Sequence, residues 1–188
     1  MHKPLKIFIL FLFISVQLTA QSKESRWVFG AGFGVAKFAS KDAAYIGDQF
    51  NFQIPRLHAT RYFFKGLSLD AGVAFNTLNK LPGLSNSISY LSLDGAVKYD
   101  FGTTDDTIVS YLMLGGSFVK ANEIITPTIN FGGGGTYWMN ARYGINVQLI
   151  YKHSLSIYKS MRPHGYFSIG VVYSLELRTL IPRLWNNN

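Results

Sequence analysis

Alternation with a period of two recurs along most of this chain and constrains its fold more than any other feature of the sequence. Within residues 26–38, the odd-numbered positions hold bulky residues such as Trp27, Phe29 and Phe33, and the even-numbered positions hold mostly glycine and other small residues. Successive side chains of a strand point to opposite faces, so this pattern predicts a strand with one bulky and one small face. The same alternation predicts four more strands, at 67–77, 90–101, 143–152 and 165–177.

Three further segments are predicted to be strands but are less regular: 50–64, 108–119 and 128–138. In the first, the apolar phase slips near Pro55. A bulge is one explanation, because proline within a sheet is confined to edges, strand starts and bulges. Short connections are expected at 65–66, 102–106 and 140–142, and longer ones at 40–49, 78–87, 120–127 and 153–164. Eight strands with such connections predict an all-β, eight-stranded antiparallel up-and-down transmembrane β-barrel with both termini in the periplasm.

A soluble up-and-down barrel would alternate in the same way, so the position of the aromatic residues decides between the two. Aromatic residues make up 15% of the chain, against 15% charged residues, which is little charge for a water-facing surface. Many are expected at the short-turn ends of the strands: Trp27, Phe29, 62–64, Tyr99, Phe101, Tyr137, Trp138, Tyr143 and Tyr173. A ring of this kind is typical of a membrane interface. The net charge of +8 is spread over single basic residues, which argues against a nucleic-acid partner.

The first 20 residues have the features of an export signal: Lys3 and Lys6, then an apolar run from Ile7 to Ile14, then a small residue, Ala20. We therefore expect a signal peptide at 1–20, a barrel at 21–177 and a periplasmic tail at 178–188. The chain has no cysteine, so it has neither a disulfide nor a lipid anchor on an N-terminal cysteine. The expected location is the outer membrane of a Gram-negative bacterium.

Four consecutive glycines, Gly132 to Gly135, raise the alternative of a phosphate-binding loop. Such a loop needs a helix after it, whereas here a three-residue turn and another alternating segment follow. We interpret the glycines as mid-strand residues. Gly132 and Gly134 are expected to face the narrow interior and to leave room for larger neighbours, and Gly133 and Gly135 to face lipid.

The interior of the predicted barrel contains charges, which are costly unless they are paired. If the strands at 67–77 and 90–101 start and end together at the short turn, Leu67 lies opposite Phe101 and Asp70 lies opposite Lys98. If 65–66 is a two-residue turn, Arg61 also lies opposite Asp70 and points inside. The residues placed inside are Asp70, Asp94, Lys98, Gln148, Ile150, Lys152, Tyr166 and Glu176. They are predicted to fill the lumen and to prevent conduction.

No catalytic, cofactor or metal site is predicted. His153, Ser154 and Ser156 lie where a strand meets its loop, but no acidic residue occurs between Glu123 and Glu176 to orient the histidine. Lys159 and Arg162 in the last long loop could contact the phosphates of lipopolysaccharide, although an ordinary solvated loop is favoured because two cations are too few to define a site.

The segments INFGGGGTYWMNARYGINVQLIYKHSL, IPRLHATRYFFKGLSLDAGVAFN and HGYFSIGVVYSLEL resemble the transmembrane domain of OmpA-like small outer-membrane proteins. The resemblance covers the barrel but no peptidoglycan-binding domain, because the chain continues only to RTLIPRLWNNN. It implies a non-enzymatic barrel with a structural role, or with an interaction role through its long loops. The expected partners are outer-membrane lipids, lipopolysaccharide among them, and a protein that the loops contact. The alternatives are a lipid-modifying enzyme of the same architecture and a soluble periplasmic lipid carrier.

Overall fold

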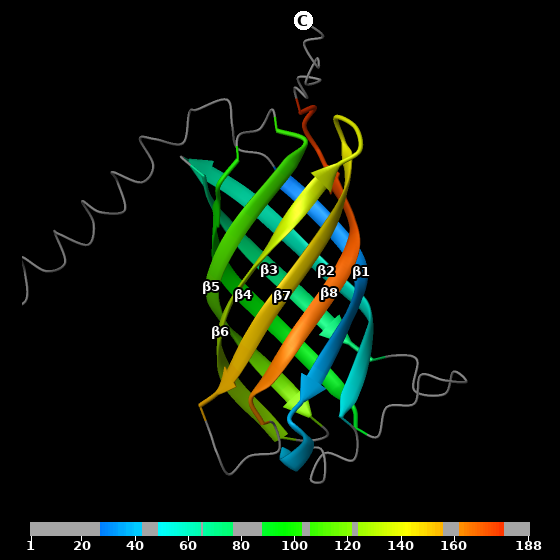
Figure 1. The fold of residues 1–188 in the computed structure, drawn as a ribbon, viewed down its shortest axis with the longest axis vertical. Coiled ribbons are helices and arrows are strands. Elements are labelled where there is room, and N and C mark those ends of the chain that lie inside the picture. The colour runs from blue at the N-terminus through cyan, green and yellow to red at the C-terminus, as the bar shows by residue number, and fades with distance from the viewer. Residues whose placement is uncertain are drawn as a thin grey trace, which may run out of the picture.

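The computed structural model describes residues 27–42, 49–64, 66–76, 88–102, 106–121, 124–155 and 162–178. They form a closed barrel in which each strand pairs antiparallel with the next and β8 pairs with β1 (Figure 1). The predicted fold class is confirmed. The strands are β1 (Trp27–Phe38), β2 (Phe50–Phe64), β3 (Leu67–Phe75), β4 (Tyr90–Asp100), β5 (Ile108–Ala121), β6 (Ile124–Trp138), β7 (Tyr143–Ser154) and β8 (His164–Ser174).

One predicted connection is wrong. The segment 120–127 was expected to be a long loop, but β5 continues to Ala121 and pairs there with Ile124, the first residue of β6. The antiparallel ladder runs through Pro127, which pairs with Phe118. β1 begins and β8 ends at the upper end of Figure 1, and β1 and β3 end at the opposite, long-loop end.

β2 is irregular at two places, and each contains an extra residue. Its pairing with β1 shifts between Gly32 and Gly34, opposite Arg56 and Gln53, so the bulge suggested by the sequence at Pro55 is confirmed. Its pairing with β3 shifts again between Tyr62 and Phe64. An extra residue exchanges the two faces of a strand. The inward residues of β2 are therefore odd-numbered before Pro55 and even-numbered from Arg56 to Tyr62.

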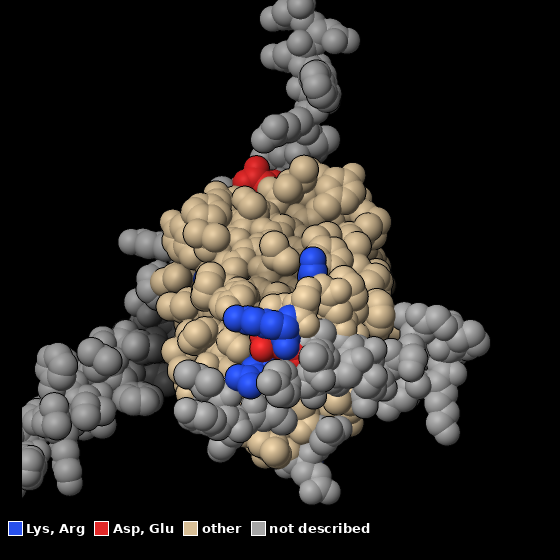
Figure 2. All heavy atoms as spheres, turned by 60° about the horizontal axis from the view of Figure 1, so that its bottom comes forward, with Lys and Arg blue, Asp and Glu red and all other residues tan. Residues whose placement is uncertain are grey.

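The two faces of the barrel wall differ in character. The outward positions carry large apolar side chains such as Leu112, Leu114 and Leu149, which are 59%, 63% and 64% exposed. Figure 2 shows the long-loop end, where the visible wall is almost without charge and lysine and arginine side chains gather near the loops. Among the described residues, no helix has the length and hydropathy to cross a membrane.

Most of the predicted aromatic ring is present on the outer face near the short turns. Its exposed members are Trp27, Phe29, Phe63, Tyr99, Phe101, Tyr137 and Tyr143. Trp138 is an exception, because it lies on the inward, even-numbered side of β6 and is 4% exposed. Tyr62 also lines the lumen. The side chain of Phe64 lies outside the described part of the structure.

Candidate functional site: the charged lumen

The long-loop half of the lumen is filled by large side chains. Phe38, Tyr90 and His164 are each at most 2% exposed, and the ring of Phe38 lies 4.9 Å from the ring of His164. Tyr90 Oη lies 3.3 Å from His164 Nε2. Phe38 and His164 are paired neighbours on β1 and β8, and Tyr90 reaches His164 from β4, which is not a neighbour of either strand. This half of the lumen is closed by packing.

The ion pair expected between Asp70 and Lys98 is present, although the predicted register is wrong. Leu67 pairs with Tyr99 rather than Phe101, and Asp70 lies opposite Ala96. Lys98, two residues along β4, reaches Asp70 diagonally, and its Nζ lies 2.7 Å from Oδ1. Diagonal neighbours remain within reach of long side chains. Both side chains are at most 5% exposed, so the pair is buried.

Arg61 does not face the lumen, contrary to the prediction. The turn pairs Phe64 with Leu67 as expected, but the extra residue at Phe63 shifts the following pairs by one. Thr60 therefore lies opposite Asp70 and donates a hydrogen bond to its carboxylate. Arg61 lies outside, with its guanidinium carbon 5.3 Å from the ring centre of Trp27.

A second ion pair crosses the lumen from β7 to β4. Lys152 Nζ lies 2.6 Å from Asp94 Oδ1 and also donates to Ser92 at 2.8 Å. The sequence placed both charged residues inside but did not pair them, because β4 and β7 are not neighbours in the sheet. Only the curvature of the closed barrel brings them together.

Arg56 is a further buried cation of the lumen and was missed by the sequence analysis. It is 3% exposed and donates from Nη2 to Gln148 Oε1 at 2.7 Å. Its guanidinium carbon lies 5.6 Å from the ring centre of Tyr166. If the slip of the apolar phase at Pro55 is interpreted as a bulge, the alternation places Arg56 on the inward face.

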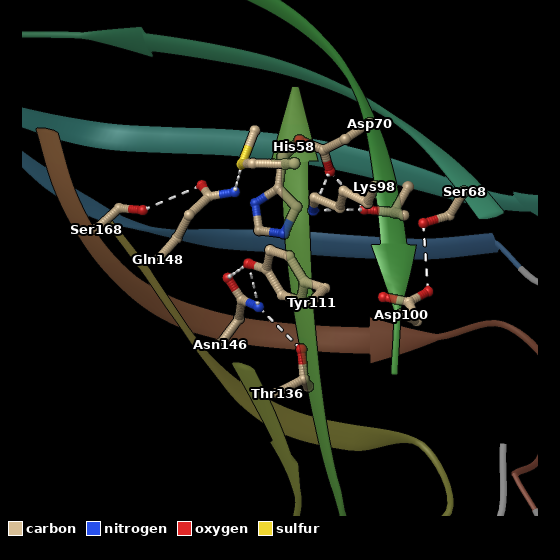
Figure 3. Close-up of polar contacts among 12 residues, drawn as sticks. His58, Ser68, Asp70, Lys98, Asp100, Tyr111, Thr136, Asn146, Gln148 and Ser168 are labelled. Carbon is tan, nitrogen blue, oxygen red and sulfur yellow. Dashed lines mark hydrogen bonds and ion pairs between the residues drawn. The ribbon is translucent and has the colours of Figure 1, made fainter. Parts of the chain in front are cut away.

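The short-turn half of the lumen contains a cavity of about 440 Å³. Lys98, His58 and Tyr111 line it, with Trp138 and Arg178 nearer the mouth. Tyr111 and Asn146 hydrogen-bond to each other at 3.0 Å, and the Asn146 amide also donates to Thr136 Oγ1 at 2.8 Å (Figure 3). The guanidinium carbon of Arg178 lies 4.2 Å from the ring centre of Trp138.

Inward-facing glycines make room for the large side chains of the lumen. A Cβ atom on Gly30 would meet the ring of His58, and one on Gly34 would meet the hydroxyl of Tyr166. Gly134, within the four-glycine run, has the hydroxyl of Tyr111 within 2.7 Å of the position of a Cβ. The prediction that inward glycines leave space for larger neighbours, made for Gly132 and Gly134, is confirmed at Gly134. At Gly132 the added Cβ would meet the backbone of Leu149 and Ile150 instead.

Other sequence-predicted residues are not brought together. His153 is exposed on the outer face of β7, whereas Ser154 is buried on the inner face. The ring centres of His153 and Tyr151 lie 6.3 Å apart. Ser156 and Lys159 lie outside the described residues. Arg162 Nε lies 3.8 Å from Asp42 Oδ1. Glu176, predicted to lie inside, is exposed beyond the end of β8. No group of three metal-binding side chains occurs among the described residues.

Comparison with family models gives no match, and comparison with curated proteins gives none either. Solved structures do match. The N-terminal β-barrel domain of Pseudomonas aeruginosa OprF has a TM-score of 0.58 at 13% identity, covering 82% of this chain and 99% of that one. Pseudomonas aeruginosa OprG has a TM-score of 0.58 at 12% identity, covering 82% and 97%. The chain has the fold of the small OmpA-like outer-membrane barrels.

The OmpA-like barrel fold also occurs in Neisserial surface protein A, which has a TM-score of 0.52 at 17% identity and covers 79% of this chain and 96% of that one. Identities this low establish the fold alone. Within this fold, the lumen contains two buried ion pairs and the buried Arg56, and such polar contacts can hold the wall together from inside.

Proposed function

We propose that this chain is an integral outer-membrane protein of a Gram-negative bacterium, with a structural role or an interaction role through its loops, and that it is not an enzyme. The observation that supports this most is the distribution of polarity. Apolar side chains face outward, whereas the paired charges of Lys98 and Lys152 face inward. In water a barrel has no reason to expose residues such as Leu149 around its whole circumference.

The proposed orientation places both termini in the periplasm and the longer connections outside the cell. It is supported by the short turns at the end where β1 begins and β8 ends, which is the arrangement usual for such barrels. The signal peptide at 1–20 and the tail at 178–188 belong to this proposal. Residues 1–26 and 179–188 lie outside the described structure.

Anionic partners at the long-loop end are proposed as well, with lipopolysaccharide the first candidate and an unknown protein the second. Lys37 and Lys120 are exposed at that end of the wall, and Arg162 lies beside it. Yersinia pestis Ail, which has a TM-score of 0.51 at 11% identity, has been solved in complex with the heparin analogue sucrose octasulfate. The contact proposed for Lys159 belongs to the same surface.

The two alternatives have less support. A lipid-modifying enzyme would need a base and a nucleophile on one side of the wall, whereas His153 and Ser154 point to opposite sides. A soluble lipid carrier would need an apolar interior, whereas the cavity of this lumen is lined by Lys98, His58 and Asp100.

The experiment that tests the proposal combines fractionation with one charge substitution in the wall. Expressed in a Gram-negative host, the protein is expected in the outer membrane, with a gel mobility that changes on boiling. Leu149→Arg, near the middle of β7, is expected to lower the free energy of unfolding in bilayers by about 2–4 kcal/mol. Leu155→Arg, just beyond the end of β7, is the control and should have little effect.

Recovery of the wild-type protein in the soluble periplasmic fraction would contradict the proposal and favour the carrier. A Leu149→Arg variant as stable as the Leu155→Arg control would also contradict the proposal, because an exposed arginine is tolerated in water but not in lipid.

A further inference from the structure

The outer wall has a groove between two rows of large side chains. Ala59, Ala71 and Gly95 are consecutive partners across β2, β3 and β4, so their small side chains form one row. The next row toward the short turns contains Arg61, Leu69, Val97 and Leu114, and the next row toward the long loops contains Leu57, Val73 and Leu93. Two hollows of about 700 and 570 Å³ lie along the small row and share Ala59 and Ala71.

The groove descends into the membrane from the short-turn end. Its upper end is bounded by Phe29, the third residue of β1 and the partner of Ala59. From Ala59 the small row runs to Gly116, the partner of Gly95 and the ninth residue of β5 from the same end. Across three strand spacings of about 4.8 Å, it extends for roughly 14 Å. One leaflet of the hydrocarbon core is about 15 Å thick, so an acyl chain fits along this length.

A single positive charge lies beside the upper part of the groove. Arg61 is exposed and lies against the rings of Trp27 and Phe63, at 5.3 and 5.5 Å. Among the described outward-facing strand residues, the other lysines and arginines are Lys37 and Lys120, both at the long-loop end. The described outward positions of β1 to β5 contain no carboxylate that could match an ammonium headgroup.

We propose that this groove binds one anionic glycerophospholipid of the leaflet at the short-turn end. One acyl chain lies along Ala59, Ala71 and Gly95, and the phosphate accepts hydrogen bonds from Arg61. The inference rests on the membrane location proposed above. A lipid fits better than a second copy of the chain, because arginine forms a bidentate pair with phosphate and the described outward positions of β1 to β5 contain no acidic residue to receive Arg61 of another copy.

Trp27, which lines the groove beside Arg61, provides the readout. A Trp138→Phe, Trp185→Phe variant keeps Trp27 as its one tryptophan, and is reconstituted in phosphatidylcholine vesicles containing brominated phosphatidylglycerol or brominated phosphatidylcholine. The anionic lipid is expected to compete for the site about fivefold better, as measured by quenching. Arg61→Gln should abolish this preference. Lys37→Gln, which removes a cation beside Phe50 at the other end of the wall, should leave it unchanged.

Native mass spectrometry of the protein with its own tryptophans gives an independent measurement. The wild type is expected as a monomer that retains one phosphatidylglycerol. Gly95→Leu fills the groove, because no atom lies within 4 Å of the added Cβ, and should lose the lipid. The control is Gly135→Leu on the outward face of β6, where the nearest neighbour lies at 3.6 Å.

Equal quenching by the two lipids would overturn the inference, as would a preference that survives Arg61→Gln. A lipid-free dimer that Gly95→Leu converts to monomers would instead assign the groove to a second copy. If any of these results is obtained while the protein still shows its boiling-dependent gel shift, only the lipid site is contradicted. Loss of that gel shift would contradict the proposed function itself.

Discussion

At the scale of single residues, the lumen is held together by charges that have partners. Asp70 and Lys98 are buried at the inner end of the short-turn cavity, and Asp94 and Lys152 are buried deeper. A buried charge that loses its partner costs far more than a pair replaced as a whole. Substitution of one partner should therefore lower the free energy of unfolding more than substitution of both.

Asp70→Ala is expected to lower the free energy of unfolding by about 3 kcal/mol, because Lys98 remains buried without its carboxylate. The double variant Asp70→Ala, Lys98→Ala should lose less than Asp70→Ala alone. Urea titration of the folded protein in lipid vesicles measures both. Lys37→Ala, which removes an exposed lysine, serves as the control. Losses that are equal or additive would show that the two residues are not coupled.

The fit between glycine and aromatic residues gives a second prediction at this scale. Gly34→Ala is expected to cost about 1–3 kcal/mol, because the new Cβ meets the hydroxyl of Tyr166. In a Tyr166→Phe background, which lacks that hydroxyl, the same change should cost less. Gly95→Ala points into open space and should have little effect. A cost of Gly34→Ala that is identical in both backgrounds would contradict the proposed contact.

At the scale of strands, alternation predicted where most elements lie, because one face of each strand is bulky and the other is small or polar. The alternation predicted the wrong face where β2 contains an extra residue. Nothing in the sequence around Phe63 indicates an extra residue, and this one residue moved Arg61 from the expected inner face to the outer face. The predicted ion pair of Asp70 and Lys98 is correct although the predicted register is wrong by two residues, because a shift of two keeps both side chains on the same face.

Contacts across the lumen and along the wall could not be predicted from the sequence in this way. Lys152 reaches Asp94 from a strand that is not its neighbour, and the row of Ala59, Ala71 and Gly95 depends on the register of three strands. Both depend on closure of the sheet and on bulge positions rather than on any local pattern.

The bulge at Pro55 can be tested with nitroxide labels on single cysteines, since the chain has no cysteine of its own. Phe52 and Leu57 are five residues apart and would face opposite sides of a regular strand. With the bulge, both face lipid, so nitroxides at Phe52→Cys and Leu57→Cys should both be accessible to oxygen and protected from a water-soluble relaxation agent. His58→Cys, on the inner face, is the control. Opposite accessibilities at positions 52 and 57 would rule out the bulge.

At the scale of the whole molecule, the lumen is divided into a packed half and a half with a cavity. Phe38, Tyr90 and His164 close the long-loop half, and the cavity of about 440 Å³ lies on the short-turn side. An eight-stranded barrel is only wide enough for its own side chains. The barrel is therefore expected to act as a wall element that presents loops, without a continuous path for ions.

Conductance across a planar lipid bilayer tests this claim most directly. The purified protein, inserted at known density, is expected to give no stable single-channel steps in salt solution. Removal of the packed plug by the triple substitution Phe38→Ala, Tyr90→Ala, His164→Ala should open a path if the variant still folds, as judged by its gel shift on boiling. Reproducible ohmic steps from the wild-type protein that change on substituting Lys98 or Lys152 would contradict the account and identify a small channel.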